Sequence, residues 1–329
     1  MIGKLIQAFL VSFAVAAAAG LFLVPYLRKI KMSEQIREDG PVWHQSKAGT
    51  PIMGGLIFII GILLTCFTVG IFALKQGETA HILILGFGLV CGAIGFVDDY
   101  VKMRKKRNMG LTAIQKLLLQ VAAAVVFLLL LRLTHQLTPS LYIPFVGVSF
   151  QLPEAVYFLL GVFIMVGCVN AVNITDGIDG LCTGVTIPVA LFFAAVAATW
   201  GYLAHGIFAA ALAGGLGAYL LYNYHPAKIW MGDTGSLFLG GVVCAMAYAY
   251  DLPLILLLVG IIYVWEALSD IIQVLYFKLS HGKRVFKMAP FHHHLEMCGW
   301  SEKKIFFVFT AISLVCCILA YFGVFQRYH

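Results

Sequence analysis

Ten stretches of the chain are each apolar over enough residues to cross the roughly 30 Å of hydrocarbon in a bilayer, which restricts the fold more than any other feature. They lie near residues 4–27, 52–74, 80–98, 114–133, 154–171, 183–200, 204–222, 235–250, 252–278 and 304–325. Of the 329 residues, 61% are hydrophobic and 11% are charged, whereas a soluble domain has roughly 25% charged residues. The sequence therefore predicts an all-α, polytopic integral membrane protein with about ten transmembrane helices, forming a single domain over residues 1–329.

The segments between these windows carry their own signals. The windows 235–250 and 252–278 nearly touch, so residues 251–253 must form a tight turn. The segment 138–154 has proline near both ends, a central glycine and partial apolar alternation, which predicts a small β-hairpin on the outer face. The first window contains small residues typical of a signal-peptide cleavage site, but its apolar run continues to Leu27, so we expect no cleavage.

The basic residues predict the orientation of the helices. Loops that should lie on one side of the membrane carry 18 of the 22 Lys and Arg residues: 28–51, 98–116, 223–234 and 278–304. An excess of Lys and Arg marks the cytoplasmic face, so both termini should lie outside. The net charge of +7 then reflects the orientation of the helices in the membrane and gives no reason to expect a nucleic-acid partner.

Several classes of protein fit the sequence poorly. The eight cysteines lie mostly inside apolar windows without Cys-x-x-Cys spacing, so they should be reduced core residues. No GxxxxGK[ST] motif occurs, which excludes a P-loop ATPase. A secondary transporter for an anion or a cation-coupled solute would show repeated halves and acids near mid-membrane, and neither stands out here.

Polar residues gather at the inner ends of the helices. These acids and histidines are Asp98, Asp99, Asp176, Asp179, Asp233, His292, His293 and His294. A charged side chain at the bilayer centre costs roughly 2.5–3.5 kcal/mol, so acids at the edge of an apolar window suggest a function. Glu266, Asp270 and Gln273 also interrupt the window 252–278, which indicates a helix that is broken or lines a cavity.

Each motif also has an ordinary structural interpretation. Two acids at a helix end are often merely solvated. The stretch "NITDGIDGL" (173–181) consists largely of turn residues. Asp233 or Thr234 fits the N-cap of a helix that begins at Gly235, and "FHHHLE" (291–296) fits an ordinary loop. Their occurrence on one side of the membrane favours convergence on a single site.

Such a site would suit a hard divalent cation. Carboxylate oxygens favour Mg²⁺ or Mn²⁺, which take roughly six oxygen ligands and often share them with substrate phosphates. Zinc is less favoured, because its two-histidine helical motif needs i, i+4 spacing and these histidines are consecutive. The lysines on the same side that would hold phosphate oxygens are Lys47, Lys102, Lys106 and Lys116. The sequence therefore predicts a phosphate or pyrophosphate substrate that binds at the membrane surface.

Four motifs carry a family resemblance. The stretches "GFVDDYVK" (95–102), "NAVNITDGIDGL" (170–181), "NYHPAKIWMGDTGSL" (223–237) and "APFHHHLE" (289–296) resemble the polyprenyl-phosphate N-acetylhexosamine-1-phosphate transferases. The histidine triplet, together with "KAGTPIMGG" (47–55), is similar to the branch of that family that uses a muramoyl-pentapeptide nucleotide. The resemblance covers nearly the whole chain, in order.

The resemblance implies a reaction. Phospho-MurNAc-pentapeptide would pass from UDP-MurNAc-pentapeptide to undecaprenyl phosphate, with Mg²⁺, giving lipid I and UMP for peptidoglycan synthesis. The alternative within the family is a transferase that uses UDP-GlcNAc. The protein would lie in the bacterial cytoplasmic membrane as a multi-pass protein that could form a homodimer. Its active site would face the cytoplasm on loops 28–51, 98–116, 171–183, 223–235 and 278–304.

The resemblance also implies residue roles. The catalytic set would be Asp98, Asp99, Asp233 and His292, with Asp233 and Asp99 on the metal. Asp98 would be the candidate base for the lipid phosphate, although a phosphate monoester with a second pKa of about 6 needs little help at neutral pH. The substrate-binding set would be Lys47, Thr50, Lys102, Lys106, Asn173, Asp176, Asp179, Gly180, Leu181, Asn223, Trp230, Gln273, His293 and His294.

Three geometric expectations accompany these roles. Asn173, Asp176 and Asp179 are spaced by three, so one helical face could carry all of them. Trp230 would lie near the uracil, or would instead be an aromatic anchor at the membrane interface. Two consecutive helical residues point about 100° apart, so the two adjacent acids of "GFVDDYVK" should have unequal roles.

Overall fold

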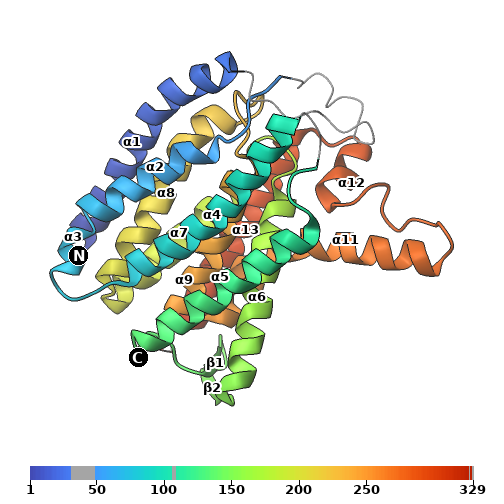
Figure 1. The fold of residues 1–329 in the computed structure, drawn as a ribbon. Coiled ribbons are helices and arrows are strands. Elements are labelled where there is room, and N and C mark those ends of the chain that lie inside the picture. Colours follow the sequence, from blue (N-terminus) through green and yellow to red (C-terminus); the bar gives the residue numbers. More distant parts are fainter. Residues whose placement is uncertain (31–48, 106–108, 326, 328–329) are drawn as a thin grey trace.

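The computed structural model describes residues 1–30, 49–105, 109–325 and 327. These residues form a bundle of helices with one two-stranded sheet (Figure 1). In chain order the elements are α1 (Ile2–Lys29), α2 (Gly55–Thr68), α3 (Ile71–Leu74), α4 (Ala80–Lys105), α5 (Ala113–Leu133), β1 (Ser140–Ile143), β2 (Val148–Gln151), α6 (Glu154–Thr175), α7 (Leu181–Trp200), α8 (Leu203–Asn223), α9 (Gly232–Ala249), the 3₁₀ turn η2 (Pro253–Ile255), α10 (Leu256–Val259), α11 (Ile261–Leu279), α12 (Phe291–Met297) and α13 (Glu302–Phe325).

The helices confirm the prediction of an all-α membrane protein and reduce the number of spans. Eight described helices are long and apolar enough to cross a membrane, or nine if a bent pair counts as one span. The window at 235–250 forms α9, which is outside that set. Its first turns carry Asp233, Thr234 and Ser236, and every residue from 234 to 249 is buried inside the bundle. Helix α9 is therefore the central helix of the fold.

The other helices pack around α9, some directly against it and others outside these. Helices α4 and α6 pack directly on α9, and α2 and α7 also contact it. A second layer consists of α1, which packs on α2 and α8, while α7 lies between α8 and α13. Buried aromatic rings join the layers, with Phe58 of α2 against both Tyr219 of α8 and Phe238 of α9.

Helix α11 leaves the bundle after a break in the window 252–278, and a broken helix is one of the two outcomes that its polar residues predicted. The chain bends by 82° between the 253–259 segment and α11. Figure 1 shows α11 projecting sideways, with α12 returning toward the bundle. Beyond Tyr263 the buried residues of α11 and α12 are all polar: Glu266, Ser269, Gln273, His292 and Glu296. We call α11, α12 and the segment between them the lateral arm.

The predicted β-hairpin and tight turn are both present. Strands β1 and β2 pair antiparallel, with Leu141 opposite Phe150. The hairpin is tied to α13, because the Phe145 N–H donates to the Gly323 carbonyl. Asp251 in the turn after α9 has a positive φ of 53° and accepts hydrogen bonds from the Thr138 N–H and hydroxyl. All eight cysteines are free, as predicted.

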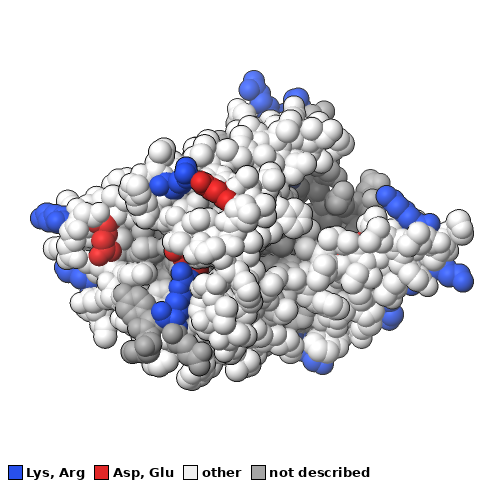
Figure 2. Space-filling model, turned by 90° about the horizontal axis from the view of Figure 1, so that it is seen from below, with Lys and Arg blue, Asp and Glu red and all other residues white. Residues whose placement is uncertain are grey.

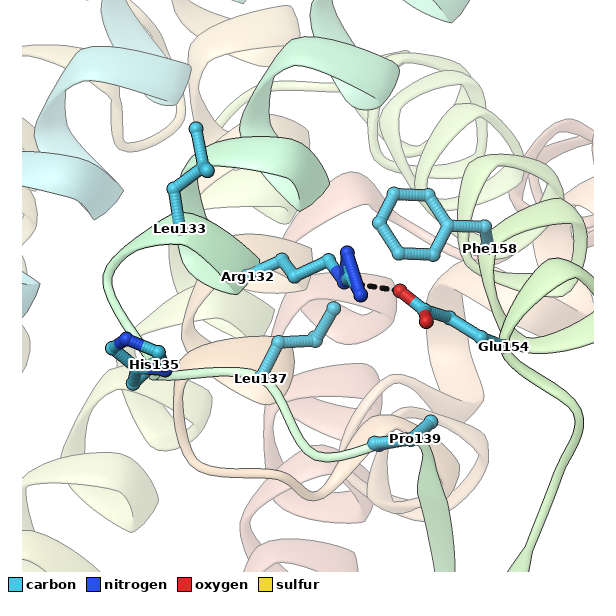
Figure 3. A pocket seen from close by; sticks show the side chains of 7 residues that line it. All are labelled: Arg132, Leu133, His135, Leu137, Pro139, Glu154 and Phe158. Atoms are coloured by element: carbon cyan, nitrogen blue, oxygen red, sulfur yellow. Dashed lines mark ion pairs between the residues drawn. The ribbon is translucent and has the colours of Figure 1, made fainter.

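Both ends of the chain lie at the hairpin end of the bundle (Figure 1). Figure 2, seen from that end, shows scattered charged side chains on a largely uncharged surface. A cavity of about 560 Å³ opens here, and Arg132 of α5 faces Glu154 of α6 across it as an ion pair (Figure 3). The C-terminal ends of α1, α4 and α8 lie at the opposite end of the bundle (Figure 1).

Close packing of α4 on α9 depends on a glycine. A Cβ atom on Gly95 would lie 2.0 Å from the carbonyl oxygen of Asp233. We expect Gly95→Ala to destabilise the protein by about 1–3 kcal/mol, the usual cost of overpacking. Gly86→Ala on the same helix is the matched control, since nothing lies within 4 Å of the position that its methyl group would take. Thermal unfolding of both purified variants in one detergent tests the difference, and equal melting temperatures would contradict it.

Candidate active site

Three carboxylates meet where the end of α4 crosses the start of α9. One oxygen from each of Asp98, Asp99 and Asp233 lies within 4.8 Å of the others. The contact between α4 and α9 along their length brings these residues together, although 134 positions separate Asp99 from Asp233 in the chain. Asp98 and Asp99 are buried, and Asp233 is partly buried. The predicted convergence of "GFVDDYVK" with "WMGDTGS" is thus a property of the fold.

Asp99 caps helix α9. Its Oδ1 accepts the Asp233 N–H at 3.1 Å, and its Oδ2 accepts the Thr234 N–H at 2.9 Å and the Thr234 hydroxyl at 2.7 Å. The helix begins at Gly232, so the N-cap interpretation of Asp233 from the sequence is wrong. A carboxylate at a helix N-terminus satisfies free N–H groups and faces the positive end of the helix dipole. Asp99 therefore holds the backbone that carries Asp233.

Asp98 reaches the cluster from a different direction than Asp99 and has different partners, as expected for two consecutive helical residues. Its Oδ1 accepts the Leu111 N–H at 2.7 Å. Its Oδ2 lies 2.9 Å from Lys102 Nζ and 3.3 Å from Lys116 Nζ. This oxygen is buried and has no hydrogen bond of normal geometry among the described residues.

Asp233 is held from both sides. Its Oδ2 accepts from Lys116 Nζ at 2.6 Å and from Lys102 Nζ at 3.1 Å. Its Oδ1 accepts from Asn173 Nδ2 at 2.8 Å, and the same amide nitrogen lies 2.7 Å from the Ser236 hydroxyl. Asn173, near the end of α6, thereby fixes the orientation of the Asp233 carboxylate.

The three acids fit a hard divalent cation. They offer carboxylate oxygens in a small, largely buried space, which suits Mg²⁺ or Mn²⁺ better than softer metals. The buried Asp98 Oδ2 lies within 3.3 Å of two ammonium groups, so it is an acceptor oriented toward positive charge. Asp98, Asp99 and Asp233 are thus the described residues that could hold a metal here, and Lys102 and Lys116 lie within reach of its phosphate ligands.

The loop after α6 corrects one geometric expectation. Helix α6 ends at Thr175 and Asp176 caps it, so Asn173, Asp176 and Asp179 do not share one helical face. The Asp179 carboxylate instead accepts hydrogen bonds from His225 Nδ1, the Ala227 N–H and Trp230 Nε1, each at 3.0 Å. Gly180 takes a positive φ of 78° at the N-cap of α7, a conformation that suits glycine.

Asp179 belongs to a second group of acidic and histidine side chains. Asp179, His225 and Glu302 form a set whose oxygen and nitrogen atoms also lie within 4.8 Å of one another. Glu302, the first residue of α13, accepts the Asp179 N–H at 3.1 Å. The three donors to the Asp179 carboxylate all belong to the 223–231 loop, so this group orders that loop and the Trp230 indole.

The remaining residues of this region support the same loop. Asn223 is buried, accepts from the Thr183 hydroxyl at 2.8 Å and donates to the Ile229 carbonyl at 3.1 Å. Gly180 precedes α7, and Leu181, its first residue, is fully buried. Thr50 directly precedes Pro51, whose carbonyl accepts the Trp230 N–H at 2.9 Å. Trp230 is thus held by Asp179 through its indole and by Pro51 through its backbone.

The histidine triplet lies on α12, a short helix where the sequence also allowed a loop. His292 is fully buried, and its Nδ1 lies 2.9 Å from Glu266 Oε2. Its Nε2 has no hydrogen-bond partner among the described residues and approaches Gly177, where a Cβ would lie 2.1 Å away. His292 therefore touches the loop that follows α6. His293 Nδ1 lies 2.7 Å from Glu296 Oε2.

Other predicted residues lie apart from the carboxylates or outside the described residues. Gln273 accepts from the Val285 and Phe286 N–H groups and donates to the Phe286 carbonyl, which fixes the lateral arm. His294 Nδ1 accepts the Lys287 N–H at 3.1 Å. Lys47 and Lys106 lie outside the residues that the structure describes.

Sequence reasoning missed several members of these networks. His225 and Ser236 lie in the stretch 223–237 that carries the family resemblance but were given no role, and Glu302 lies in none of the quoted motifs. Glu266 had a signal, because it interrupts an apolar window. Lys116 was assigned to the phosphate-binding face but not to the binding set, although the structure gives it the shortest contact to Asp233.

A helical membrane bundle with a carboxylate–lysine cluster at one end fits the class of membrane-embedded glycosyl transferases. The family model of "Glycosyl transferase family 4" matches residues 81–251, a stretch that includes Asp98, Asp99 and Asp233. Proteins named phospho-N-acetylmuramoyl-pentapeptide-transferase are similar over almost their whole length. The one from Caldanaerobacter subterraneus is 46% identical over 98% of this chain and 99% of its own, and the one from Clostridium acetobutylicum is 43% identical over 97% and 98%. The chain belongs to the phospho-N-acetylmuramoyl-pentapeptide-transferase family.

Proposed function

We propose that the protein transfers phospho-MurNAc-pentapeptide from UDP-MurNAc-pentapeptide to undecaprenyl phosphate, releasing UMP and forming lipid I. Family membership supports the reaction. The structural observation that carries it is the meeting of three carboxylates with Lys102 and Lys116 at one end of the membrane bundle. Acids that can hold a divalent cation and lysines that can hold phosphates are what a phosphoryl transfer between two anionic substrates requires.

The acidic residues would bind the metal and the basic residues would bind the phosphates. A Mg²⁺ ion bound by Asp233 with Asp98 or Asp99 would supply charge neutralisation and orientation for the pyrophosphate. Lys102 and Lys116 would bind phosphate oxygens as flexible point charges. Asn173 keeps the Asp233 carboxylate in one orientation, and Asp98 is placed to receive a proton from the lipid phosphate. Because that phosphate has a second pKa of about 6, it is mostly a dianion at neutral pH, and orientation contributes more than proton removal.

The nucleotide sugar would bind beside the carboxylates. Asp179, the 223–231 loop and α12 enclose this side, and Trp230 offers a fixed aromatic face for a uracil ring. His292 and His293 would face the sugar–phosphate side of the same pocket, with His294 and Gln273 supporting the lateral arm. The inner loops carry most of the basic residues, so we place the site on the cytoplasmic face of the bacterial inner membrane. A homodimer stays a prediction.

Release of UMP tests the reaction. Purified protein in detergent with undecaprenyl phosphate and Mg²⁺ should release UMP from UDP-MurNAc-pentapeptide and almost none from UDP-GlcNAc. Chelation of the metal should abolish release, and added Mg²⁺ should restore it. Comparable rates with UDP-GlcNAc would contradict the muramoyl substrate in favour of the related GlcNAc-1-phosphate transferase. Full activity in the presence of chelator would contradict the metal requirement.

A further inference from the structure

Two ammonium groups occupy the space between Asp98 and Asp233. Lys102 Nζ lies 2.9 Å from Asp98 Oδ2 and 3.1 Å from Asp233 Oδ2, and Lys116 Nζ lies 3.3 Å and 2.6 Å from the same two oxygens. Both lysines therefore bridge the same pair of oxygen atoms. A divalent cation bound by these acids would need those oxygens.

The two lysines offset the charges of Asp98 and Asp233 without a metal. Together the two ammonium groups carry the charge of one divalent cation, and they neutralise two carboxylates that would otherwise repel each other, while the third acid, Asp99, faces the N-terminus of α9. A divalent cation a few ångströms from two ammonium groups in a partly buried site would be strongly repelled. The metal and both lysines cannot hold these positions at the same time.

The acids are fixed and the lysines can move. Asp99 is bonded to backbone donors of α9, Asp98 Oδ1 to the Leu111 N–H, and Asp233 Oδ1 to the Asn173 amide. The lysines, in contrast, reach the acids with flexible four-carbon side chains from two different helices, and their side chains keep 16% and 21% of their surface exposed. A rearrangement at this site would therefore move the ammonium groups.

We propose that Lys102 and Lys116 are place-holders for the metal: they neutralise Asp98 and Asp233 in the empty enzyme and leave these oxygens when a divalent cation binds. The released ammonium groups are then free to bind substrate phosphates. This inference rests on the proposed function, because it takes the three acids as the metal site. The inference predicts that the two lysines weaken metal binding, because they compete with the metal, and strengthen binding of the anionic substrate.

The test measures metal binding directly. Mn²⁺ titration of the purified protein, followed by the electron paramagnetic resonance of free Mn²⁺, gives a dissociation constant without turnover. Lys116→Gln removes a positive charge from the metal position, so we expect roughly tenfold or greater tightening of Mn²⁺ binding. UMP release by the same variant at saturating metal should fall. A lysine with a merely structural role would weaken both when it is removed.

Matched variants separate this effect from general electrostatics. Lys105→Gln removes a charge from an exposed side chain on the same turn of α4 as Lys102, and it should leave Mn²⁺ affinity close to that of the wild type. Lys116→Arg keeps the charge and should also bind Mn²⁺ with near wild-type affinity. Lys102→Gln makes the same prediction as Lys116→Gln at a second position, and it decides the question if Lys116→Gln is not recovered folded.

The outcomes distinguish the inference from the proposed function. Unchanged or weaker Mn²⁺ binding in the Lys116→Gln and Lys102→Gln proteins would overturn the place-holder role. Equal tightening in Lys105→Gln would overturn it too, because the effect would then be one of net charge. If the wild type binds no Mn²⁺, or if Asp233→Asn binds it as well as the wild type does, the metal site itself is wrong and the inference fails with it.

Discussion

Asp233→Asn is expected to lower turnover by about 10²–10³-fold while leaving the fold intact. Asparagine has nearly the same volume and keeps an oxygen that can accept from Asn173. It loses the negative charge that faces Lys102 and Lys116 at 3.1 Å and 2.6 Å, and with it the strongest candidate ligand for the metal. UMP release measured over a range of Mg²⁺ concentrations gives the effect, and thermal unfolding checks the fold.

A remote acid provides the control for this variant. Asp251→Asn removes a carboxylate in the turn at the hairpin end of the bundle, where it contacts Thr138 and Arg327. It should keep near wild-type turnover even if the protein melts at a lower temperature. Asp233→Asn protein that works at the wild-type rate under limiting Mg²⁺ would remove Asp233 from the metal site.

Asp98→Asn and Asp99→Asn are expected to fail in different ways. Asp99 caps α9 with three hydrogen bonds, and an amide nitrogen turned toward those N–H groups cannot accept them. Loss of a helix cap costs about 0.5–2 kcal/mol, so Asp99→Asn should lower the melting temperature and reduce turnover at every pH. Asp98→Asn should keep its melting temperature, because asparagine can still accept the Leu111 N–H.

The pH dependence separates the two variants further. If Asp98 handles the proton of the lipid phosphate, the activity of Asp98→Asn should partly recover as pH rises, since more of the lipid phosphate is already a dianion above its second pKa of about 6. Rate profiles from about pH 6 to about pH 9 for both variants measure this. Parallel profiles, or equal melting temperatures, would refute the division of roles between the two acids.

Much of the fold could be predicted from apolar length alone. Each of the ten windows is helical in the structure, and the hairpin at 138–154 and the turn at 251–253 follow from their prolines and glycines. The number of spans was less predictable. Helix α9 is central, so it is buried by other helices and tolerates polar residues that lower its hydropathy, and the 82° bend before α11 divides one window into two directions.

The candidate site was predictable in its members and not in its contacts. Motifs indicated Asp98, Asp99 and Asp233, because charged residues at the edge of an apolar window need a reason. Sequence spacing could not show that Asp99 binds the backbone of α9, since that bond joins residues 134 positions apart. It also misled at Asp179, where helical periodicity was assumed beyond the true end of α6. Packing between helices determines both the contact of Asp99 with α9 and the position at which α6 ends.

The lateral arm has a thermodynamic consequence. Beyond its first turn the buried side chains of the arm are all polar, and hydrogen bonds such as Glu266–His292 and Gln273–Phe286 join parts of the arm to one another. Each such bond contributes only about 0.5–1.5 kcal/mol net, whereas α9 is held by apolar packing along its whole length. We therefore expect the arm to open as a unit at a free energy below that of global unfolding. His292 would then leave the 176–180 loop, and return to it, while the carboxylate cluster stays assembled.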